Sequence, residues 1–280
     1  MEEEEVEMSF FAALPDVAVT IGSTAVSIRN RIQRELDKTV FCKYIAFTNV
    51  PPSLLEDRKR PIFPKSTRIF YNHDTRQLLV KLVATPHEIA ERTLEFGVNA
   101  ELLSMGLATS VVLTGSGRIR GNACSKEPDG TWRHKSLPAG RTTEWPSVVI
   151  ETGVSEGWTQ LKRDAEWWIN NSHGQVKLVI LIRANKSLPE IKYETIISGA
   201  PSPALRSGRV RYQCLPRQSI VQSRPVNQPG APITTVGVTP LVVKFDEIFL
   251  RQPAPPEHDI HVSLQWMEHI SRTVWAELGI

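Results

Sequence analysis

Residues 146–182 constrain the fold of this chain more than any other segment. They begin with an apolar run at residues 146–151, which has the length of a strand. Residues 155–171 then carry apolar side chains at the spacing of an amphipathic helix, and residues 176–182 form a second apolar run. A strand, a helix and a strand in this order predict a βαβ-like unit, because parallel strands need a long crossover connection. Part of the sheet is therefore expected to be parallel.

The flanking segments add helices and strands. Apolar residues recur at helical spacing over residues 23–39, and two apolar runs around a turn-forming cluster predict a hairpin at residues 68–83. Thr85 opens the capping-box pattern of a helix, which we expect to reach Gly106 and which Gly97 could interrupt. Further strands are expected at residues 40–47, 110–114, 191–197, 209–214, 219–222, 234–238 and 241–249, and a final helix at residues 259–278.

These elements predict an α/β fold with a central mixed sheet flanked by helices. We expect residues 1–66 to form a helical N-terminal extension and residues 67–252 to form the core domain. Residues 253–280 should supply a C-terminal helix that packs on the core, because apolar residues repeat along one face of that helix.

Composition excludes several classes of protein. Lys and Arg number 33 against 30 Asp and Glu, and 41% of the residues are apolar, so the chain is neither a polycation nor a disordered tail. The three cysteines lie far apart and form no CxxC pair, which argues against a disulfide framework or a cysteine zinc site. Five Glu among the first seven residues are unlike a secretory leader, and no apolar run is long enough to cross a bilayer. We expect a protein of the cytosol or nucleus, without a membrane partner.

The most informative polar residues lie in and before the βαβ-like segment. Neither a GxSxG elbow nor a GxxxxGK[ST] phosphate loop occurs. Asp129 follows Pro128, Glu151 ends an apolar strand, and the next helix carries Lys162 and Arg163. Two carboxylates at strand ends would make an oxygen-ligand site that suits Mg²⁺ or Mn²⁺, and a nearby cation could steady a phosphate.

This combination, with its order of helix, strands, helix and strand, resembles the PD-(D/E)XK nuclease-like superfamily, which has the restriction-endonuclease-like fold. The resemblance covers roughly residues 68–251, is sharpest over residues 126–130 and 146–156, and is strongest to a fungal group of uncharacterised proteins. By that resemblance Asp129 corresponds to the aspartate of the PD motif and Glu151 to the (D/E) acid. A carboxylate from the preceding helix sometimes joins them, and the candidates here are Glu101 and Glu95.

The resemblance implies a divalent-metal-dependent, nuclease-like phosphodiesterase that acts on DNA or RNA. Its metal, Mg²⁺ or Mn²⁺, would be held by Asp129, Glu151 and Glu101. Asp129 and Glu151 would also act in catalysis, together with Lys162.

One position departs from the family pattern. The lysine of E-x-K falls two residues after the acid, on the same face of the strand, and that position is Gly153 here. Some members of the superfamily carry the lysine on the next helix, so we assign the role to Lys162, with Arg163 and Lys177 as further candidates. The alternative is a catalytically inactive domain that keeps the fold as a nucleic-acid-binding or protein-binding module.

A basic region follows the candidate centre. No acidic residue occurs between Thr195 and Phe245, whereas that stretch contains several cations that could track phosphates. The candidates for nucleic-acid binding are Arg206, Arg209, Arg211 and Arg217. Arginines on edge strands, which suppress pairing between sheets, are an equally good interpretation. Among the tryptophans, Trp132 and Trp167 are the candidates for stacking on bases.

Overall fold

The computed structural model describes residues 19–21, 24–38, 43–56, 62–154, 157–202 and 210–280. The chain divides into two compact units, which we treat separately. Unit 1 comprises residues 1–84 and 117–127, and unit 2 comprises residues 85–116 and 128–280. The division therefore falls after Ala84, whereas the sequence analysis placed the start of the core at residue 67, because the predicted hairpin pairs with other strands of unit 1.

Unit 1 contains a six-stranded sheet with the order β1-β2-β4-β3-β7-β6. Its strands are β1 (Val19–Ile21), β2 (Lys43–Thr48), β3 (Thr67–Asn72), β4 (Gln77–Leu82), β6 (Ile119–Arg120) and β7 (Cys124–Lys126), and its helices are α2 (Ala25–Leu36) and α3 (Ser53–Glu56). Helix α2 begins where Thr24 Oγ1 accepts a hydrogen bond from the Ser27 amide. Its apolar residues Ile28 and Ile32 are fully buried in a core shared with β2, β3 and β4.

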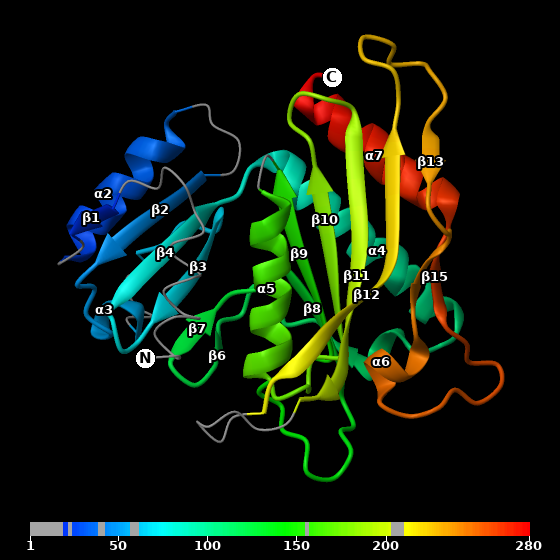
Figure 1. The fold of residues 1–280 in the computed structure, drawn as a ribbon, viewed down its shortest axis with the longest axis horizontal. Coiled ribbons are helices and arrows are strands. Elements are labelled where there is room, and N and C mark those ends of the chain that lie inside the picture. Colours follow the sequence, from blue (N-terminus) through cyan, green and yellow to red (C-terminus); the bar gives the residue numbers. More distant parts are fainter. Residues whose placement is uncertain (1–18, 22–23, 39–42, 57–61, 155–156, 203–209) are drawn as a thin grey trace. The chain divides into compact units, whose positions relative to one another are not determined.

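Unit 2 is built on a seven-stranded sheet with the order β13-β12-β11-β10-β9-β8-β5 (Figure 1). The strands are β5 (Val111–Val112), β8 (Gly130–His134), β9 (Val148–Val154), β10 (Leu178–Ala184), β11 (Glu190–Pro201), β12 (Tyr212–Ser223) and β13 (Thr234–Val236). Strands β9 and β10 are parallel and the other neighbours are antiparallel, which confirms the α/β fold with a mixed sheet.

Two helices cover the centre of this sheet, α4 (Thr85–Ser104) and α5 (Trp158–Asn171), and both contact β9 and β10. A Cβ atom on Gly130 would lie 3.0 Å from Glu91 of α4 and 3.3 Å from Ile150. The next residue of β9, Glu151, instead accepts a hydrogen bond from Trp168 of α5. Because successive side chains of a strand point to opposite faces, α4 and α5 lie on opposite faces of the sheet, as Figure 1 shows.

Helix α7 (Leu264–Leu278) packs against α4 and completes the core of unit 2. Trp266 Nε1 donates a hydrogen bond to the carbonyl of Thr93, and its ring stacks on Phe96. A Cβ atom at Gly97 would lie 2.4 Å from the same indole nitrogen, so only glycine permits this approach. Gly97 therefore does not interrupt α4, which continues past it. The glycine makes room for a tryptophan.

The C-terminal third differs from the sequence analysis in three places. Residues 209–214 and 219–222, expected as two strands, belong largely to the single strand β12, although residue 209 itself lies outside the described residues. The run 241–249, expected as one strand, forms β14 (Leu241–Val243) and then the short helix α6 (Phe245–Phe249). The final helix begins at Leu264, because residues before it form β15 (Ile260–Val262), which pairs with β14. The Phe245 amide that opens α6 donates to the carboxylate of Asp259, which links this turn to the start of β15.

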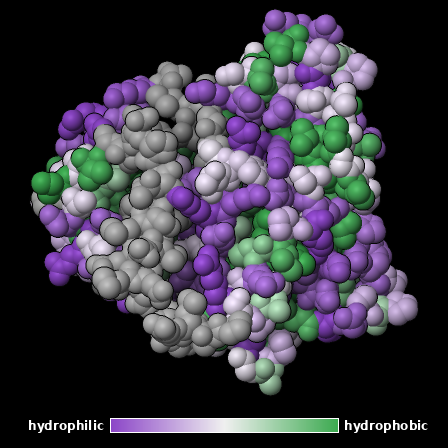
Figure 2. Space-filling view, viewed as in Figure 1, coloured by the Kyte–Doolittle hydropathy of each residue, from purple (hydrophilic) through white to green (hydrophobic). Residues whose placement is uncertain are grey.

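The helix in the middle of the sequence-predicted βαβ-like unit starts at Trp158, and residues 155 and 156 lie outside the described part of the chain. In the residues that the structure describes, no helix has both the length and the apolar character needed to cross a membrane. On the face shown in Figure 2, hydrophobic and hydrophilic residues of unit 2 are interspersed.

Candidate functional site

The two predicted acids lie close together along the backbone of the seven-stranded sheet. Glu151 is in β9, and Asp129 directly precedes β8, whose residues Gly130 and Thr131 pair with Ile150 and Val149. The Asp129 amide donates to the carbonyl of Ile150 at 3.3 Å, so the fold brings together two residues that are 22 positions apart in the sequence. Their carboxylates, however, contact helices on opposite faces of the sheet, α4 for Asp129 and α5 for Glu151.

Asp129 is wholly buried and its carboxylate is held from two sides. Its Oδ2 accepts a hydrogen bond of 2.8 Å from the backbone amide of Thr152, at the point where β8 begins. The same oxygen lies 3.1 Å from Nε2 of His87, a buried residue in the first turn of α4. Asp129 thus joins β9 to α4 directly before β8.

Glu151 is also buried, with 3% of its surface exposed. Its Oε1 accepts a hydrogen bond of 2.5 Å from Nε1 of Trp168 on α5. Trp168 is itself fully buried and packs edge-to-face on Trp167. The helix that follows the acid therefore fixes the orientation of its carboxylate.

Glu91 of α4 lies beside Gly130, the residue that follows Asp129. Its Oε1 is 3.5 Å from Nη1 of Arg92. Several carboxylates surround Arg92: burial lowers its pKa, but Glu91, Glu95 and Glu88 outweigh that effect and raise it. Glu95 pairs with Arg92 at 2.8 Å.

Glu101, the third ligand predicted from the sequence, lies on the last turns of the same helix. It follows Glu91 by ten residues, which corresponds to about 15 Å along the helix axis. Its side chain is partly exposed. The structure therefore places Glu91, rather than Glu101, beside the start of β8.

Lys162, the predicted catalytic cation, extends from α5 toward β11. Its Nζ lies 3.4 Å from Oε1 of Glu194, which also pairs with Lys192 at 3.0 Å. Strand β11 is two strands away from β9, or about 10 Å. Lys177, a further candidate, precedes β10 and donates to the carbonyl of Gly174.

A different cation lies next to the vacant lysine position. Strands β9 and β10 are paired in parallel register, so that Leu181 is the partner of Glu151 and Arg183 is the partner of Gly153. Paired residues of adjacent strands project from the same face of the sheet. Arg183 therefore lies on the same face as Glu151, one strand over from the position that E-x-K assigns to lysine.

The predicted nucleic-acid-binding arginines fall into two groups. Arg206 and Arg209 lie outside the described residues. Arg211 is 3.9 Å from Glu166, and Arg217 pairs with Glu247 and donates to the carbonyl of Val242 at 2.7 Å.

Neither tryptophan proposed as a stacking platform is exposed. Trp132 is fully buried and donates to Asn99 at 2.9 Å, and Trp167 is 8% exposed. The prediction that these rings could stack on bases was wrong, because both belong to the core of unit 2.

The chemistry available at this site is that of carboxylates and one arginine. Within the described ranges, no cluster of three or more His, Cys, Asp and Glu side chains is arranged to hold a metal ion. Mg²⁺ commonly binds proteins through one or two carboxylates and completes its shell with water and substrate phosphates. Asp129 and Glu151 meet that smaller requirement in donor type, but their carboxylates contact helices on opposite faces of the sheet.

Three residues of this region escaped sequence reasoning. His87 and Glu91 looked like ordinary positions in a helical pattern, and only the packing of α4 on the start of β8 gives them their neighbours. Arg183 could have been found, since aligning the two apolar runs 148–154 and 178–184 as parallel partners places it beside Gly153.

No protein-family model and no curated protein sequence matches the chain. Among solved structures, the chain is similar in part to a crystal structure described as "a putative nuclease belonging to DUF820" from Anabaena variabilis. The match covers 50% of this chain and 83% of the other, with 11% identity and a TM-score of 0.33.

Proposed function

We propose that unit 2 is the core of a divalent-metal-dependent, nuclease-like phosphodiesterase. The observation that carries this proposal is the order α4, β5, β8, β9, α5, β10, with Asp129 directly before β8 and Glu151 in the neighbouring strand β9. Helix, strands, helix and strand in this order, with the last two strands parallel, agree with the resemblance to the PD-(D/E)XK superfamily. The relation to a fungal group of that superfamily belongs to the same proposal.

Asp129 and Glu151 would hold the metal, Mg²⁺ or Mn²⁺, and an acid of α4 would complete the protein ligands. Glu91 is better placed for that role than Glu101, because it lies beside the residue that follows Asp129. When bound, the ion would polarise a phosphoryl oxygen and lower the pKa of a coordinated water. Because Asp129 contacts α4 and Glu151 contacts α5, the carboxylate of Glu151 would have to leave Trp168 to share an ion with Asp129.

Arg183 would supply the positive charge that Gly153 does not. A guanidinium on the same face as Glu151 could stabilise charge that develops on a phosphate. Lys162 is the competing candidate from the sequence, and it would have to leave Glu194 to act. The substrate would be a DNA or RNA phosphodiester, to which the arginines of residues 206–217 could contribute contacts.

The test is Mn²⁺ binding measured by calorimetry on the wild type and on Asp129→Asn and Glu151→Gln variants. These substitutions remove charge but keep an oxygen that can accept the bonds from Thr152 and Trp168. The exposed Glu144→Gln variant is the matched control. We expect binding in the wild type and the control, and at least a tenfold weaker affinity in each site variant.

A second measurement tests for a metal site that is complete only when the nucleic-acid substrate is bound. Binding is repeated with a phosphorothioate-protected oligonucleotide present, and cleavage of the unprotected strand is followed with and without metal. Absence of metal binding in both conditions would contradict the proposal. If cleavage is observed and Arg183 supplies the positive charge of the site, Arg183→Met should reduce cleavage more than Lys162→Met.

One observation favours the alternative, an inactive domain that binds nucleic acid or protein. The carboxylates of Asp129 and Glu151 receive their hydrogen bonds from helices on opposite faces of the sheet, and both side chains are buried. Such an arrangement is also what two structural acids would show. Full retention of fold and nucleic-acid binding without any metal effect would support this alternative.

A further inference from the structure

A concave site lies in unit 2, near the start of β9 and β10 and away from the two acids. It is a cavity of about 570 Å³ between the segment before β9, the start of β10, and helix α6 with the residues after it. Lys177 directly precedes β10, and Arg141 donates to Ser147, directly before β9, at 3.0 Å. From Ser147 to Thr152 a strand advances about 16 Å, so this cavity is separate from the acids.

Positive charge dominates the lining. Five cations contribute to it, and they are Arg141, Lys177, Arg217, Lys244 and Arg251. Two carboxylates, Asp246 and Glu247, oppose them. The excess of cations over acids in the lining is therefore three.

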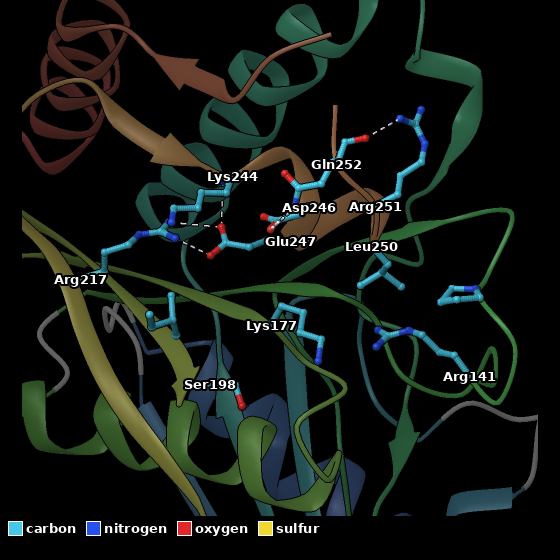
Figure 3. Close-up of a pocket in the computed structure, with 12 residues that line it drawn as sticks. Arg141, Lys177, Ser198, Arg217, Lys244, Asp246, Glu247, Leu250, Arg251 and Gln252 are labelled. Carbon is cyan, nitrogen blue, oxygen red and sulfur yellow. Dashed lines mark hydrogen bonds and ion pairs between the residues drawn. The ribbon is translucent and has the colours of Figure 1, made fainter. Parts of the chain in front are cut away.

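Two of the five cations are neutralised within the protein. Arg217 pairs with Glu247, and dashed lines in Figure 3 mark this contact. Arg251 binds Glu257 through both terminal nitrogens at 2.6 Å, and this pairing lowers the pKa of Glu257 to about 2. Neither needs a ligand to balance its charge.

The other three cations form no ion pair with a carboxylate in the part of the chain that the structure describes. Arg141 donates to the carbonyl of Pro146 and to the Ser147 hydroxyl, and Lys177 donates to the carbonyl of Gly174. The side chain of Lys244 is exposed at the rim. Asp246 is the remaining acid, and its contact is with the Gln252 amide at 3.5 Å.

Arg141 and Lys177 are close enough to repel each other. In Figure 3 their nitrogen ends point toward one another. Burial lowers the pKa of Lys177, and the charge of Arg141 lowers it further. Burial also lowers the pKa of Arg141 to about 10, with a further contribution from Arg133. The folded protein thus holds two cations together at a cost in free energy, without an acid that offsets it.

We propose that this cavity binds the phosphate monoester of a ligand of nucleotide size, with Arg141 and Lys177 as the principal contacts and Lys244 at the rim. A phosphate monoester carries close to two negative charges at neutral pH and offers three acceptor oxygens. A guanidinium matches two of those oxygens at once, and an ammonium adds a point charge. A carboxylate would leave more of the positive charge unbalanced.

The size of the cavity indicates that more than the phosphate enters it. Ligand pockets of about 300 to 1,000 Å³ accommodate drug-sized molecules, which are far larger than inorganic phosphate. The rest of the lining includes the apolar residues Pro138, Ile197 and Leu250, which could contact a base or sugar. Asp246 and Ser198 provide polar atoms for hydroxyl groups. The inference does not depend on the proposed metal site.

A phosphate monoester of this kind could come from a free mononucleotide or from the terminal phosphate of an oligonucleotide. Calorimetric titrations with adenosine 5′-monophosphate, with adenosine, and with a short oligonucleotide bearing a 5′-phosphate or a 5′-hydroxyl distinguish the two sources. We expect wild-type protein to bind at least one phosphorylated probe and to bind its unphosphorylated counterpart at least tenfold more weakly.

The variants are Lys177→Met and Arg141→Met, each compared with Lys186→Met, an exposed lysine in the turn after β10. Each pocket variant should weaken binding of the phosphorylated probe at least tenfold, and Lys186→Met should leave it unchanged. Circular dichroism and thermal melting confirm that each variant folds. If one pocket variant fails to fold, the other carries the test.

Equal affinity for phosphorylated and unphosphorylated probes would overturn the proposal, as would an affinity that the pocket variants do not change. Failure of the wild type to bind either phosphorylated probe would also overturn it. None of these results depends on metal, because all titrations are run in the presence of a chelator, and a failure of the proposed nuclease function is therefore distinguishable.

Discussion

Two regions along the central strands of unit 2 differ in how their charged side chains are balanced. In the acidic region, midway along β9, Asp129 and Glu151 are buried, and each accepts hydrogen bonds from the protein itself. Before the start of β9 and β10, Arg141 and Lys177 line an open cavity and have only neutral partners among the described residues. The acids therefore have a structural explanation in the folded chain alone, whereas the cations do not.

This difference changes how much each site says about function. Buried charges that are paired or hydrogen-bonded are expected in any stable domain, and a metal role for them needs separate proof. Cations kept together without an acid are costly, and a bound anion is the simplest way to offset the cost. The sequence motif drew attention to the acids, but the cavity carries the stronger physical argument for a ligand.

The largest expected effect is the loss of stability when an acid of the acidic region is removed. Asp129→Ala would leave the amide of Thr152 and the ring of His87 without their acceptor inside the core. We expect a loss of about 3 kcal/mol in the free energy of unfolding, measured by urea denaturation. Asp246→Ala at the cavity is the matched control, and this exposed residue should cost less than about 0.5 kcal/mol. Similar losses of unfolding free energy at both positions would contradict the stated difference between the buried acids and the cavity.

A smaller effect is expected from a change in the helix that carries His87. Gly97→Ala would place a methyl group 2.4 Å from the indole nitrogen of Trp266 and force α4 and α7 apart. We expect a cost of about 2 kcal/mol, as for other overpacked contacts. Gly157→Ala, where the new Cβ meets no atom within 4 Å, serves as the control.

The same Gly97→Ala variant sharpens the comparison. It should weaken metal binding by Asp129 and Glu151, because α4 contacts Asp129 through His87. Phosphate-monoester binding at the cavity should remain within twofold of the wild type. Parallel changes in both affinities would show that the two sites are coupled.

The smallest predicted effect is the pH dependence of stability from Lys177. Its pKa in the folded protein lies below the ordinary value of 10.5, because of burial and of Arg141. Between these two pKa values the unfolded chain binds more protons than the folded chain, so stability rises with pH in that window. As the pH rises to 10.5, the free energy of unfolding of the wild type should therefore increase relative to that of Lys177→Met.

Lys186→Met provides the reference curve for that experiment. A phosphorylated ligand in the cavity should reduce the pH-dependent shift, because a nearby anion favours the charged form of Lys177. An identical curve for the two lysine variants would contradict the assignment of Lys177 to a desolvated position.

Periodicity predicted the centre of unit 2 well. The runs 146–151 and 176–182 are fully apolar or nearly so, because β9 and β10 are covered on both faces by α4 and α5. The apolar pattern of such strands, and of the helix between them, can be recognised in the sequence. The mixed sheet followed from the crossover that joins parallel strands.

Features that depend on long-range contacts were not predictable in the same way. Phe245–Phe249 reads as the end of a strand, yet it forms α6, whose first amide donates to Asp259 far along the chain. Gly97 reads as a helix breaker, but the reason for glycine is Trp266, 169 residues later. Local patterns carry no information about partners of this kind.

The candidate site was predicted in part. The sequence indicated Asp129 and Glu151, and the structure places them close together along the backbone, with Asp129 directly before β8 and Glu151 in β9. It could not show that Lys162 pairs with Glu194 or that Arg183 lies beside Gly153, since both depend on the order of strands in the sheet. The roles of all these residues stay predictions until metal binding is measured.

The interleaving of the two units limits how this protein can vary. The chain passes from unit 1 to unit 2 after Ala84, returns at Gly117 to supply β6 and β7, and enters unit 2 again at Pro128. A single recombination between genes would therefore cut through at least one of the two sheets or separate strands that pair with each other. Exchange of either unit as a module would require several coordinated crossovers, so the two units are expected to be inherited together.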